Sequence, residues 1–552
     1  MVASLRVRAW ALPCLLYHRR MLMPAPRLMA SAADATPFQP LTPSAKAADT
    51  IFALSSGAGV RAGVSVIRIS GPQARHVILR MAPGRNGVLP EPRRAALRSL
   101  RKPPPLESTA ATIDGAAVAS TGEAQEVIDR ALVLWFPGPK SFTGEDTVEL
   151  HTHGSRAVVS ATLQALGEIE GCRLAERGEF SRQAFSNGQM DLMEVEGLAD
   201  LINADTEQQR KQALAQMEGV QRRQYEAWRK QLLTCLAHTE ALIDFGDDEE
   251  DVTAAALEGA LTKTRLVGEQ MQAALTDGER GEAVREGVRV AILGPPNAGK
   301  SSLLNLLAQR DAAIVSPVAG TTRDVVTVSL SLGGLPVILS DTAGLRADTN
   351  DPIEQMGMQR SAREAARAHL QLWVFDAAEP PLTEDSVDAA AAAAAATEAV
   401  GGAHDEGSDD GSAEGAQAAP ARLLILNKVD LRESAPASSP LFAEENQWSL
   451  SCRTQQGVDD FLEALGAMVR KSYGADEREP ALVTRARHRE HLLRCVAALE
   501  TFERLAAMGE GAPLDLATEE LRYAANEIGR ITGKIDVEEL LDVIFRDFCI
   551  GK

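Results

Sequence analysis

The spacing of apolar residues divides the chain into a strand-rich region, a long helical region, a mixed region and a second helical region. From about residue 49 to 153, short runs rich in Val, Ile and Leu lie between Gly and Pro residues, a pattern typical of β-strands. The predicted strands are Val64–Ile69, Val127–Phe136 and Thr147–His153.

The next region is predicted to be helical. No proline occurs between Lys140 and Gly294. Apolar residues recur at helical spacing, and long stretches of mixed polar and apolar residues follow up to Phe245. The residues that set this spacing are Leu192, Val195, Leu198, Leu201 and Ile202.

Strand-like and helix-like patterns alternate from Val288 to about Tyr473, which is typical of the βαβ units of a parallel sheet. The tail from His488 to Lys552 is helical again, with Pro513 as its only proline. Because helical sequence flanks the mixed region on both sides, we predict an α/β domain inserted into a helical domain.

The composition is that of a multidomain globular protein. A length of 552 residues suggests roughly three or four domains. The 57 Lys and Arg against 77 Asp and Glu give a net charge of −20, which argues against a protein that coats nucleic acid or membrane through bulk charge. The six cysteines form no CxxC pair, so neither a disulfide framework nor a zinc site is indicated. No apolar run approaches the length of a membrane span.

The N-terminus differs from the rest of the chain. Residues 1–33 contain arginines and no acid, interspersed with Leu, Trp and Met, a composition typical of an organelle transit peptide. A disordered tail of chance composition is the alternative. We expect a transit peptide over residues 1–34 and import into the mitochondrial matrix, with the plastid as the alternative. The arginines are Arg6, Arg8, Arg19, Arg20 and Arg27.

A second atypical segment lies within the mixed region. Residues 381–420 hold nine acids, no Lys or Arg, and an alanine run from Ala389 to Ala396. Such low-complexity sequence predicts a solvated, disordered insertion without a catalytic role.

A nucleotide site begins directly after the predicted strand Val288–Leu293. The following segment, Gly294–Ser301, reads GPPNAGKS and is a complete P-loop motif. Its glycines let backbone N–H groups surround phosphates, Lys300 reaches the β- and γ-phosphates, and the Ser301 hydroxyl ligates Mg²⁺. The helix that this arrangement requires is predicted over Ser302–Leu307.

Three further motifs follow in the order of a GTPase. TTRD at Thr321–Asp324 supplies Thr322 as the second Mg²⁺ ligand, and DTAG at Asp341–Gly344 follows the predicted strand Val337–Leu339. NKVD at Asn427–Asp430 follows the predicted strand Leu423–Leu426.

The last motif selects the base. The Asp430 carboxylate can accept two hydrogen bonds from guanine, whereas adenine would leave it unpaired. The residues expected to bind GTP are Asn297, Ala298, Gly299, Lys300, Ser301, Ser302, Thr321, Thr322, Asp341, Thr342, Ala343, Gly344, Asn427, Lys428, Asp430, Ser451, Cys452 and Arg453.

One position departs from many GTPases. Leu345 follows the DTAG motif, where a Gln often orients the attacking water. Because leucine has no hydrogen-bonding group, either hydrolysis is poor or another residue and a cation take over this task.

Sequence around the GTPase motifs resembles the MnmE/TrmE family of tRNA modification GTPases. The resemblance runs from about Asp49 to Lys552, broken only by the low-complexity insertion. The motifs that carry it are PKSFTGED at Pro139–Asp146, RGEFS at Arg177–Ser181, AFSN at Ala184–Asn187 and FCIGK at Phe548–Lys552.

The resemblance implies an α/β plus α fold with a Ras-like P-loop G domain inserted into a two-segment helical domain. The expected domains are an N-terminal tetrahydrofolate-binding and dimerisation domain over 47–187, a first helical segment over 188–283, the G domain over 284–474, and a second helical segment with the CIGK motif over 475–552.

The resemblance also implies a K⁺-stimulated GTPase that acts as a homodimer with an FAD-containing partner of the MnmG/GidA type. Together they would install a carboxymethylaminomethyl or taurinomethyl group on carbon 5 of the wobble uridine of tRNA, which is held mainly by the complex. The one-carbon donor would be 5,10-methylene-tetrahydrofolate, or a 5-formyl analogue in the same site. Two alternatives stay open: a ribosome-assembly GTPase that acts as an RNA-binding switch, and a regulatory GTPase without tRNA chemistry.

Catalytic positions for GTP hydrolysis carry over from the family residue by residue. The implied K⁺ ligands are Asn297, Ser316, Val318 and Thr321. Glu354 matches the glutamate that orients water, which would compensate for Leu345; the alternative is a solvated carboxylate at a helix start. Lys300 and Glu354 are the candidate catalytic residues for GTP hydrolysis, and Cys549 is the candidate for one-carbon transfer.

Folate positions carry over in the same way. Arg68, Glu149 and Lys552 match the family's pattern, and Gln189 stands where the family has a basic residue. Cys549 is either a nucleophile in one-carbon transfer or a small packed residue. His151 and His153 would share one strand face, and no acid or cysteine cluster completes a metal site with them.

Overall fold

The computed structural model describes residues 49–56, 62–84, 87–103, 126–245, 250–310, 313–314, 327–341, 367–378, 420–432, 443–474, 481–508 and 513–535, together with residues 541, 544, 545, 548 and 551.

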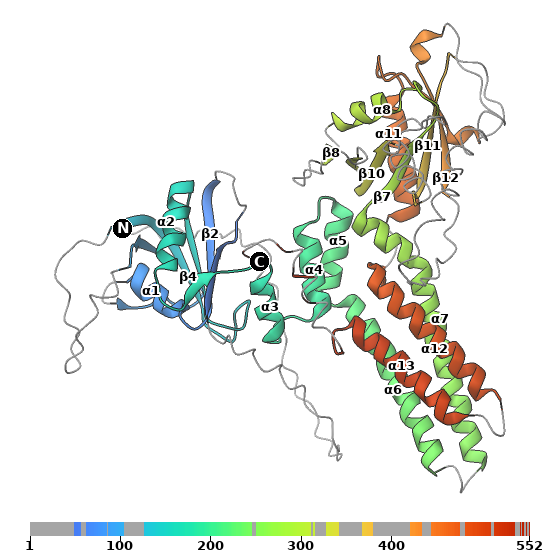
Figure 1. The fold of residues 1–552 in the computed structure, drawn as a ribbon, viewed down its shortest axis with the longest axis horizontal. Helices are drawn as coiled ribbons and strands as arrows, with labels where there is room; N and C mark the ends of the chain where they lie inside the picture. The colour runs from blue at the N-terminus through green and yellow to red at the C-terminus, as the bar shows by residue number, and fades with distance from the viewer. Residues whose placement is uncertain are drawn as a thin grey trace, which may run out of the picture. The chain divides into compact units, whose positions relative to one another are not determined.

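An α/β unit begins the described chain (Figure 1). Six strands among the described residues form a mixed sheet in the order β3-β4-β5-β2-β1-β6. Helices α1 and α2 bury their apolar residues against one face of this sheet, where Val77 and Leu166 pack with Ile67 and Leu150. The elements are β1 (Thr50–Leu54), β2 (Ala62–Ser70), α1 (Ala74–Met81), β3 (Ala96–Arg101), β4 (Val127–Phe136), β5 (Thr147–Gly154), α2 (Arg156–Gly167), β6 (Cys172–Leu174) and α3 (Glu179–Ser186).

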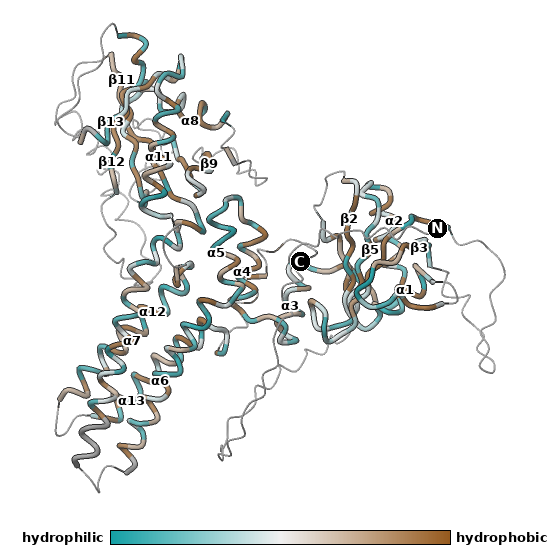
Figure 2. The backbone as a smooth tube through the Cα atoms, turned by 180° about the vertical axis from the view of Figure 1, so that it is seen from behind, coloured by the Kyte–Doolittle hydropathy of each residue, from teal (hydrophilic) through white to brown (hydrophobic). Residues whose placement is uncertain are grey.

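The helical domain is assembled from two distant segments, as the sequence predicted. Its helices are α4 (Leu192–Ile202), α5 (Glu207–Met217), α6 (Val220–Phe245), α7 (Glu250–Glu286), α12 (Ala486–Ala506) and α13 (Leu514–Ile531). Figure 1 shows α12 and α13 beside α6 and α7, and Trp228, Val267, Phe502 and Leu521 from these four helices share one core. Brown and teal alternate along the four helices in Figure 2, as expected when each buries one face. No helix within the described ranges is long and apolar enough to cross a membrane.

The inserted domain is built on a second sheet. Seven strands of the described residues run in the order β13-β12-β11-β7-β10-β9-β8. Strands β13, β12, β11, β7 and β10 are parallel, whereas β9 and β8 pair in antiparallel fashion. The elements are β7 (Val288–Leu293), α8 (Lys300–Ala308), β8 (Ala313–Ile314), β9 (Thr327–Leu332), β10 (Leu335–Asp341), β11 (Leu370–Asp376), β12 (Ala421–Asn427), β13 (Gln447–Ser449) and α11 (Val458–Tyr473).

This topology positions the site. The carboxyl ends of parallel strands meet at one edge of a sheet, where α/β proteins bind ligands. Gly294, Asp341, Asp376 and Asn427 lie at the carboxyl ends of four parallel neighbours, β7, β10, β11 and β12. The α/β plus α fold with an inserted P-loop domain is therefore confirmed.

Candidate functional site

The P-loop connects β7 to α8 through backbone conformations that few side chains tolerate. Gly294 and Gly299 have φ angles of +139° and +99°, and Asn297 has a φ of 63°. A Cβ atom on Gly294 would lie 2.1 Å from the Val374 carbonyl oxygen of the neighbouring strand. The loop therefore needs glycine at Gly294 to turn closely against β11.

Helix α8 points its N-terminus at the loop. Its N-cap is Gly299, and no side chain caps the first N–H groups, which leaves them to bind an anion such as phosphate. The buried Lys300 donates hydrogen bonds from Nζ to the carbonyl oxygens of Gly294 and Pro295, both at 2.9 Å. Burial lowers the pKa of Lys300 and the nearby Asp341 carboxylate opposes this shift. The Lys300 ammonium group is thus held against the backbone at the start of the P-loop.

Two oxygen ligands suited to Mg²⁺ converge beside the loop. Ser301 donates a 2.5 Å hydrogen bond to Oδ2 of Asp341. The other carboxylate oxygen, Oδ1 of Asp341, is buried and has no hydrogen-bond partner among the described residues. Such an orphaned oxygen next to a hydroxyl fits a hard cation that takes oxygen ligands.

Asn427 joins the base end of the site to the P-loop. Its Nδ2 donates to the carbonyl oxygen of Ala298 at 2.9 Å, and its Oδ1 accepts from the backbone N–H of Cys452 at 3.1 Å. A Cβ atom on Gly299 would lie 2.1 Å from this same Nδ2. Ala298 and Asn427 are both buried, so three separate segments are fixed to one another by a single amide.

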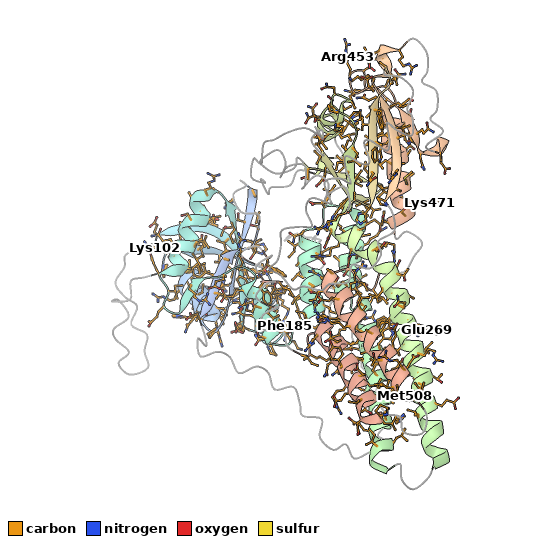
Figure 3. The ribbon with its side chains drawn as sticks, turned by 45° about the vertical axis from the view of Figure 1, so that its right-hand side comes forward. Lys102, Phe185, Glu269, Arg453, Lys471 and Met508 are labelled. Carbon is orange, nitrogen blue, oxygen red and sulfur yellow. The ribbon has the colours of Figure 1, made fainter. Side chains whose placement is uncertain are left out.

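The Asp430 carboxylate is held in place by residues of the segment that follows β13. Ser451 donates a 2.6 Å hydrogen bond to Oδ1 of Asp430, and Arg453 lies 4.0 Å from the other oxygen. Arg453 is exposed and projects from the sheet domain (Figure 3). Lys428 follows Asn427 in a left-handed conformation with φ of 66°, and Ser302 lies exposed on α8.

Several expected site residues lie outside the described residues. They are Ser316, Val318, Thr321, Thr322, Thr342, Ala343, Gly344, Glu354, Cys549 and Lys552.

A second polar site lies on the N-terminal sheet. Arg68 on β2 donates from Nε and Nη2 to Oε1 of Glu149 on β5, at 3.2 and 3.0 Å. His151 Nε2 lies 3.4 Å from the other Glu149 oxygen. Burial raises the pKa of Glu149, but His151 and Arg68 together outweigh it and hold the pKa below its ordinary value. Glu149 is therefore a half-buried carboxylate that stays charged.

Aromatic rings border this ion pair. The Arg68 guanidinium carbon lies 5.2 Å from the ring centre of Phe142 and 5.9 Å from that of Phe180. Arg68, Glu149 and the partly exposed Phe142 ring can together bind a flat, polar heterocycle, whereas the fully buried Phe180 belongs to the core against which Phe142 packs.

Gln189 lies next to the loop that carries Phe142. A Cβ atom on Gly144 in that loop would meet Cγ of Gln189 at 3.3 Å. Asn187 donates a 2.7 Å hydrogen bond to the Thr143 carbonyl oxygen, which fixes α3 to the loop. Gln189 itself is exposed and carries no charge.

The described end of the C-terminal tail reaches this sheet. Ser55, just after β1, donates a 2.9 Å hydrogen bond to the carbonyl oxygen of Gly551. Gly551 has φ of +97°, and a Cβ there would lie 2.3 Å from the Leu54 carbonyl oxygen. The tail therefore reaches the sheet that carries Arg68 and Glu149.

Sequence reasoning missed four residues at these sites. Phe142 and Phe180 lie within quoted family motifs, and the sequence favoured a structural role for His151 over that of a metal ligand. Asp376 ends β11, and its Oδ2 lies 2.7 Å from Nζ of Lys428. An acid that ends a buried strand next to the NKVD strand was a usable signal, because both strand ends meet at the same sheet edge.

Two family models match the chain. The model described as GTP-binding protein TrmE N-terminus matches residues 50–189, and the model described as MnmE helical domain matches residues 192–549.

Curated relatives cover almost the whole chain. A tRNA modification GTPase MnmE of Parvibaculum lavamentivorans is 47% identical over 504 residues, which is 91% of this chain and 100% of that protein. The mitochondrial 5-taurinomethyluridine-[tRNA] synthase subunits GTPB3 of Danio rerio and Homo sapiens are each 43% identical, and each match covers 91% of this chain and 93% of the relative. The P-loop, the NKVD motif and these relationships along 91% of the chain show that the chain belongs to the MnmE/TrmE family of GTPases.

Proposed function

We propose that this chain is the GTP-hydrolysing subunit of an organellar complex that modifies carbon 5 of the wobble uridine of tRNA. The observation that carries the proposal is the match along 91% of the chain to relatives named for tRNA modification and 5-taurinomethyluridine synthesis. A ribosome-assembly switch would explain the G domain, but it would leave the Arg68–Glu149 site without a role.

Loss of the gene in its own organism tests this function. We expect nucleoside mass spectrometry of organellar tRNA to lose the C5-substituted wobble uridine, and we expect the wild-type gene to restore it. A gene encoding Lys300→Ala is expected to fail, because the residue that reaches the phosphates is gone. Lys471→Ala removes an exposed lysine of the same domain (Figure 3) and is expected to restore the nucleoside. Unchanged wobble uridines after gene loss would contradict the proposal.

For hydrolysis, Lys300 and the α8 N-terminus bind the phosphates, and Asp430 with Ser451 reads guanine. Ser301 and Thr322 would hold Mg²⁺, with Asp341 beside it, and the ion would neutralise charge on the β- and γ-phosphates. The orphaned Oδ1 of Asp341 supports this assignment.

The second cation is proposed to be K⁺. Asn297, Ser316, Val318 and Thr321 would hold it, and it would stabilise charge that develops between the β- and γ-phosphates. The left-handed backbone of Asn297 at the exposed tip of the P-loop supports this role. Glu354 would orient the attacking water in place of the residue that Leu345 cannot provide.

The N-terminal site is proposed to bind a tetrahydrofolate one-carbon donor. Glu149 would accept hydrogen bonds from the pterin ring, while Arg68 and Lys552 would pair with the anionic tail. The tail position of Gly551 beside β1 supports a contribution from the C-terminus. Cys549, close to Lys552 in sequence, keeps two possible roles: a nucleophile or a packing residue.

Folate affinity should change in opposite directions at two positions. Arg68→Ala is expected to weaken binding of 5-formyl-tetrahydrofolate about tenfold, because a partly buried charge-assisted contact is lost. Gln189→Lys is expected to strengthen binding about threefold, because it restores a cation at an exposed position near an anionic ligand.

Isothermal titration calorimetry of the full chain measures both effects. Arg156→Ala, which removes an exposed arginine at the start of α2, is the matched control and should leave the affinity unchanged. Equal affinity of wild type and Arg68→Ala would rule out this site.

The partners proposed are an FAD protein of the MnmG/GidA type, tRNA bound through the complex, and a second copy of the chain. Exposed apolar residues of the N-terminal sheet support a dimer, since Leu97 and Leu132 are cross-strand neighbours there and are 70% and 42% exposed. Neighbouring exposed apolar residues of this kind mark an interaction surface.

The proposed compartment is the mitochondrial matrix. The relatives from Danio rerio and Homo sapiens are named as mitochondrial, and residues 1–33 contain arginine without any acid.

A further inference from the structure

Asp376 ends strand β11, the parallel neighbour of the strand that carries the NKVD motif. In the register of β11 and β12, Asp376 lies opposite Asn427. The backbone N–H of Ala377 donates a 2.7 Å hydrogen bond to the Asn427 carbonyl oxygen. The backbones on both sides of the base site are therefore fixed to each other at this point.

Each oxygen of the Asp376 carboxylate has its own donor. Oδ1 accepts from the backbone N–H of Ala378 at 2.9 Å, and Oδ2 accepts from Nζ of Lys428 at 2.7 Å. The Asp376 side chain is only 14% exposed. Burial raises its pKa, but Lys428 and the Ala378 N–H outweigh this and lower the pKa below the ordinary value.

The conformational freedom of Lys428 is restricted at both its backbone and its side chain. Its backbone is left-handed, and it stands between Asn427, which is tied to the P-loop, and the guanine-reading Asp430. Because Asp376 holds the ammonium group at 2.7 Å, the apolar four-carbon stem is fixed at both ends, by the left-handed backbone and by this ion pair. A lysine without such an anchor would lose side-chain entropy on being ordered by a ligand.

We propose that Asp376 is a positioning residue for nucleotide binding: it anchors the Lys428 ammonium, so that the lysine stem is already in place when guanine nucleotide enters. The inference rests on the proposed function only as far as guanine-nucleotide binding. It predicts an effect on affinity and not on the bond-breaking step, because neither side chain lies at the Ser301–Asp341 end of the site.

Asp376→Asn tests the proposal with a side chain of the same size. An amide has one oxygen for two donors, so the contact with Lys428 or with Ala378 must be lost. We expect the dissociation constant of N-methylanthraniloyl-GDP and the KM for GTP to rise about five- to tenfold, with kcat within about twofold of wild type.

The decisive comparison uses Lys428→Ala as a second background. If Asp376 acts through Lys428, Asp376→Asn should change KM by less than about twofold when the ammonium is already absent. This comparison also covers any loss of G-domain stability in the single variant, since such a loss would reappear in the Lys428→Ala background. Asp459→Asn, which alters a 79% exposed aspartate paired with Arg310 on the same domain, should leave both constants unchanged.

Equal losses in the two backgrounds, or a fall in kcat with unchanged KM, would overturn the proposal. Failure of the function itself is distinguishable. A wild-type chain that binds guanine nucleotide but is not needed for tRNA modification would refute the proposed function and leave the role of Asp376 intact.

Discussion

Gly299→Ala is expected to reduce the affinity for GTP about 100-fold or more and to abolish hydrolysis at ordinary GTP concentrations. The new Cβ would lie 2.1 Å from Nδ2 of Asn427, at a backbone φ of +99°. A left-handed conformation costs a non-glycine residue about 1–3 kcal/mol. Displacing Asn427 also breaks its bonds to Ala298 and Cys452, at about 1–3 kcal/mol for each buried group left unpaired.

Both costs fall on the nucleotide site, because the α8 N-terminus and the base site would be separated by the movement of Asn427. Equilibrium titration with N-methylanthraniloyl-GDP and steady-state phosphate release measure the loss. Gly259→Ala on α7 is the matched control, since a Cβ there meets nothing within 4 Å, and it should be neutral or slightly stabilising. Wild-type affinity in Gly299→Ala would show that the Asn427 link is dispensable.

Local sequence predicted the elements that have a strong apolar pattern of their own. The expected strands Val127–Phe136 and Val288–Leu293 are β4 and β7 with the same bounds. Both are mainly apolar runs ended by a Gly or Pro, so chain composition alone defines where they stop.

Helix α1 was missed because it lies among strands and is short. Its buried residues Ala74, Val77, Ile78 and Met81 have helical spacing, so a signal was present. The three-residue strand β6 gave no such signal. It exists because it pairs in parallel with β1, more than a hundred residues earlier in the chain, and that pairing is a tertiary effect.

Motifs predicted which residues would form the nucleotide site, but not the contacts that hold those residues in place. The contacts of Asn427 with Ala298 and of Lys428 with Asp376 depend on which strands become neighbours in the sheet. A pattern read along the chain cannot supply this order when a long insertion separates β11 from β12. The same holds for the Arg68–Glu149 site, where Phe180 comes from a different element than Arg68.

The helical domain depends most on contacts that sequence could not reveal. Glu196 on α4 is 1% exposed and contacts three cationic or polar groups from the second helical segment. Nη2 of Arg487 lies 2.9 Å from Oε1, while Nε2 of His488 and Nε of Arg485 lie 3.2 and 3.7 Å from Oε2. Almost 300 residues, including the G domain, separate these partners along the chain.

Arg485, which lies just before α12 where the chain returns from the G domain, also forms an ion pair with α4. Its Nη2 contacts both oxygens of Asp200 at 2.9 Å. Asp200 accepts a further 3.1 Å hydrogen bond from Arg285, at the end of α7 where the chain leaves for the G domain. One helix, α4, therefore holds both connections to the inserted domain through buried or half-buried ion pairs.

At neutral pH this cluster contains a charged Glu196 and an uncharged His488. Burial raises the pKa of Glu196, but Arg487, Arg485 and His488 hold it far below the ordinary value. Burial lowers the pKa of His488 to about 4, against the opposing effect of Glu196. One carboxylate thus faces two guanidinium groups and a neutral imidazole.

Glu196→Gln is expected to destabilise the helical domain by about 3–5 kcal/mol, because it breaks an ion pair at a buried carboxylate, leaving Arg487 without its counter-charge and Arg485 with Asp200 alone. Differential scanning calorimetry should show the melting temperature of this domain falling by about 10 °C. Saturating GDP identifies the transition, since it should raise the melting temperature of the nucleotide-binding G domain much more than that of the helical domain. Glu490→Gln makes the same change in an exposed ion pair with Arg494 on α12 and should cost less than about 1 kcal/mol.

The pH dependence separates a charge effect from a packing effect. Because the folded-state pKa of Glu196 lies below its ordinary value of 4.5, its charge stabilises the fold fully above that pH, and this contribution is lost as the pH falls further. The stability difference between wild type and Glu196→Gln should therefore be constant from pH 7 to about 5 and should shrink from about pH 4.5 towards pH 3. A difference that stays the same over the whole range would mean that Glu196 acts through shape and hydrogen bonding, and that its charge does not hold the two helical segments together.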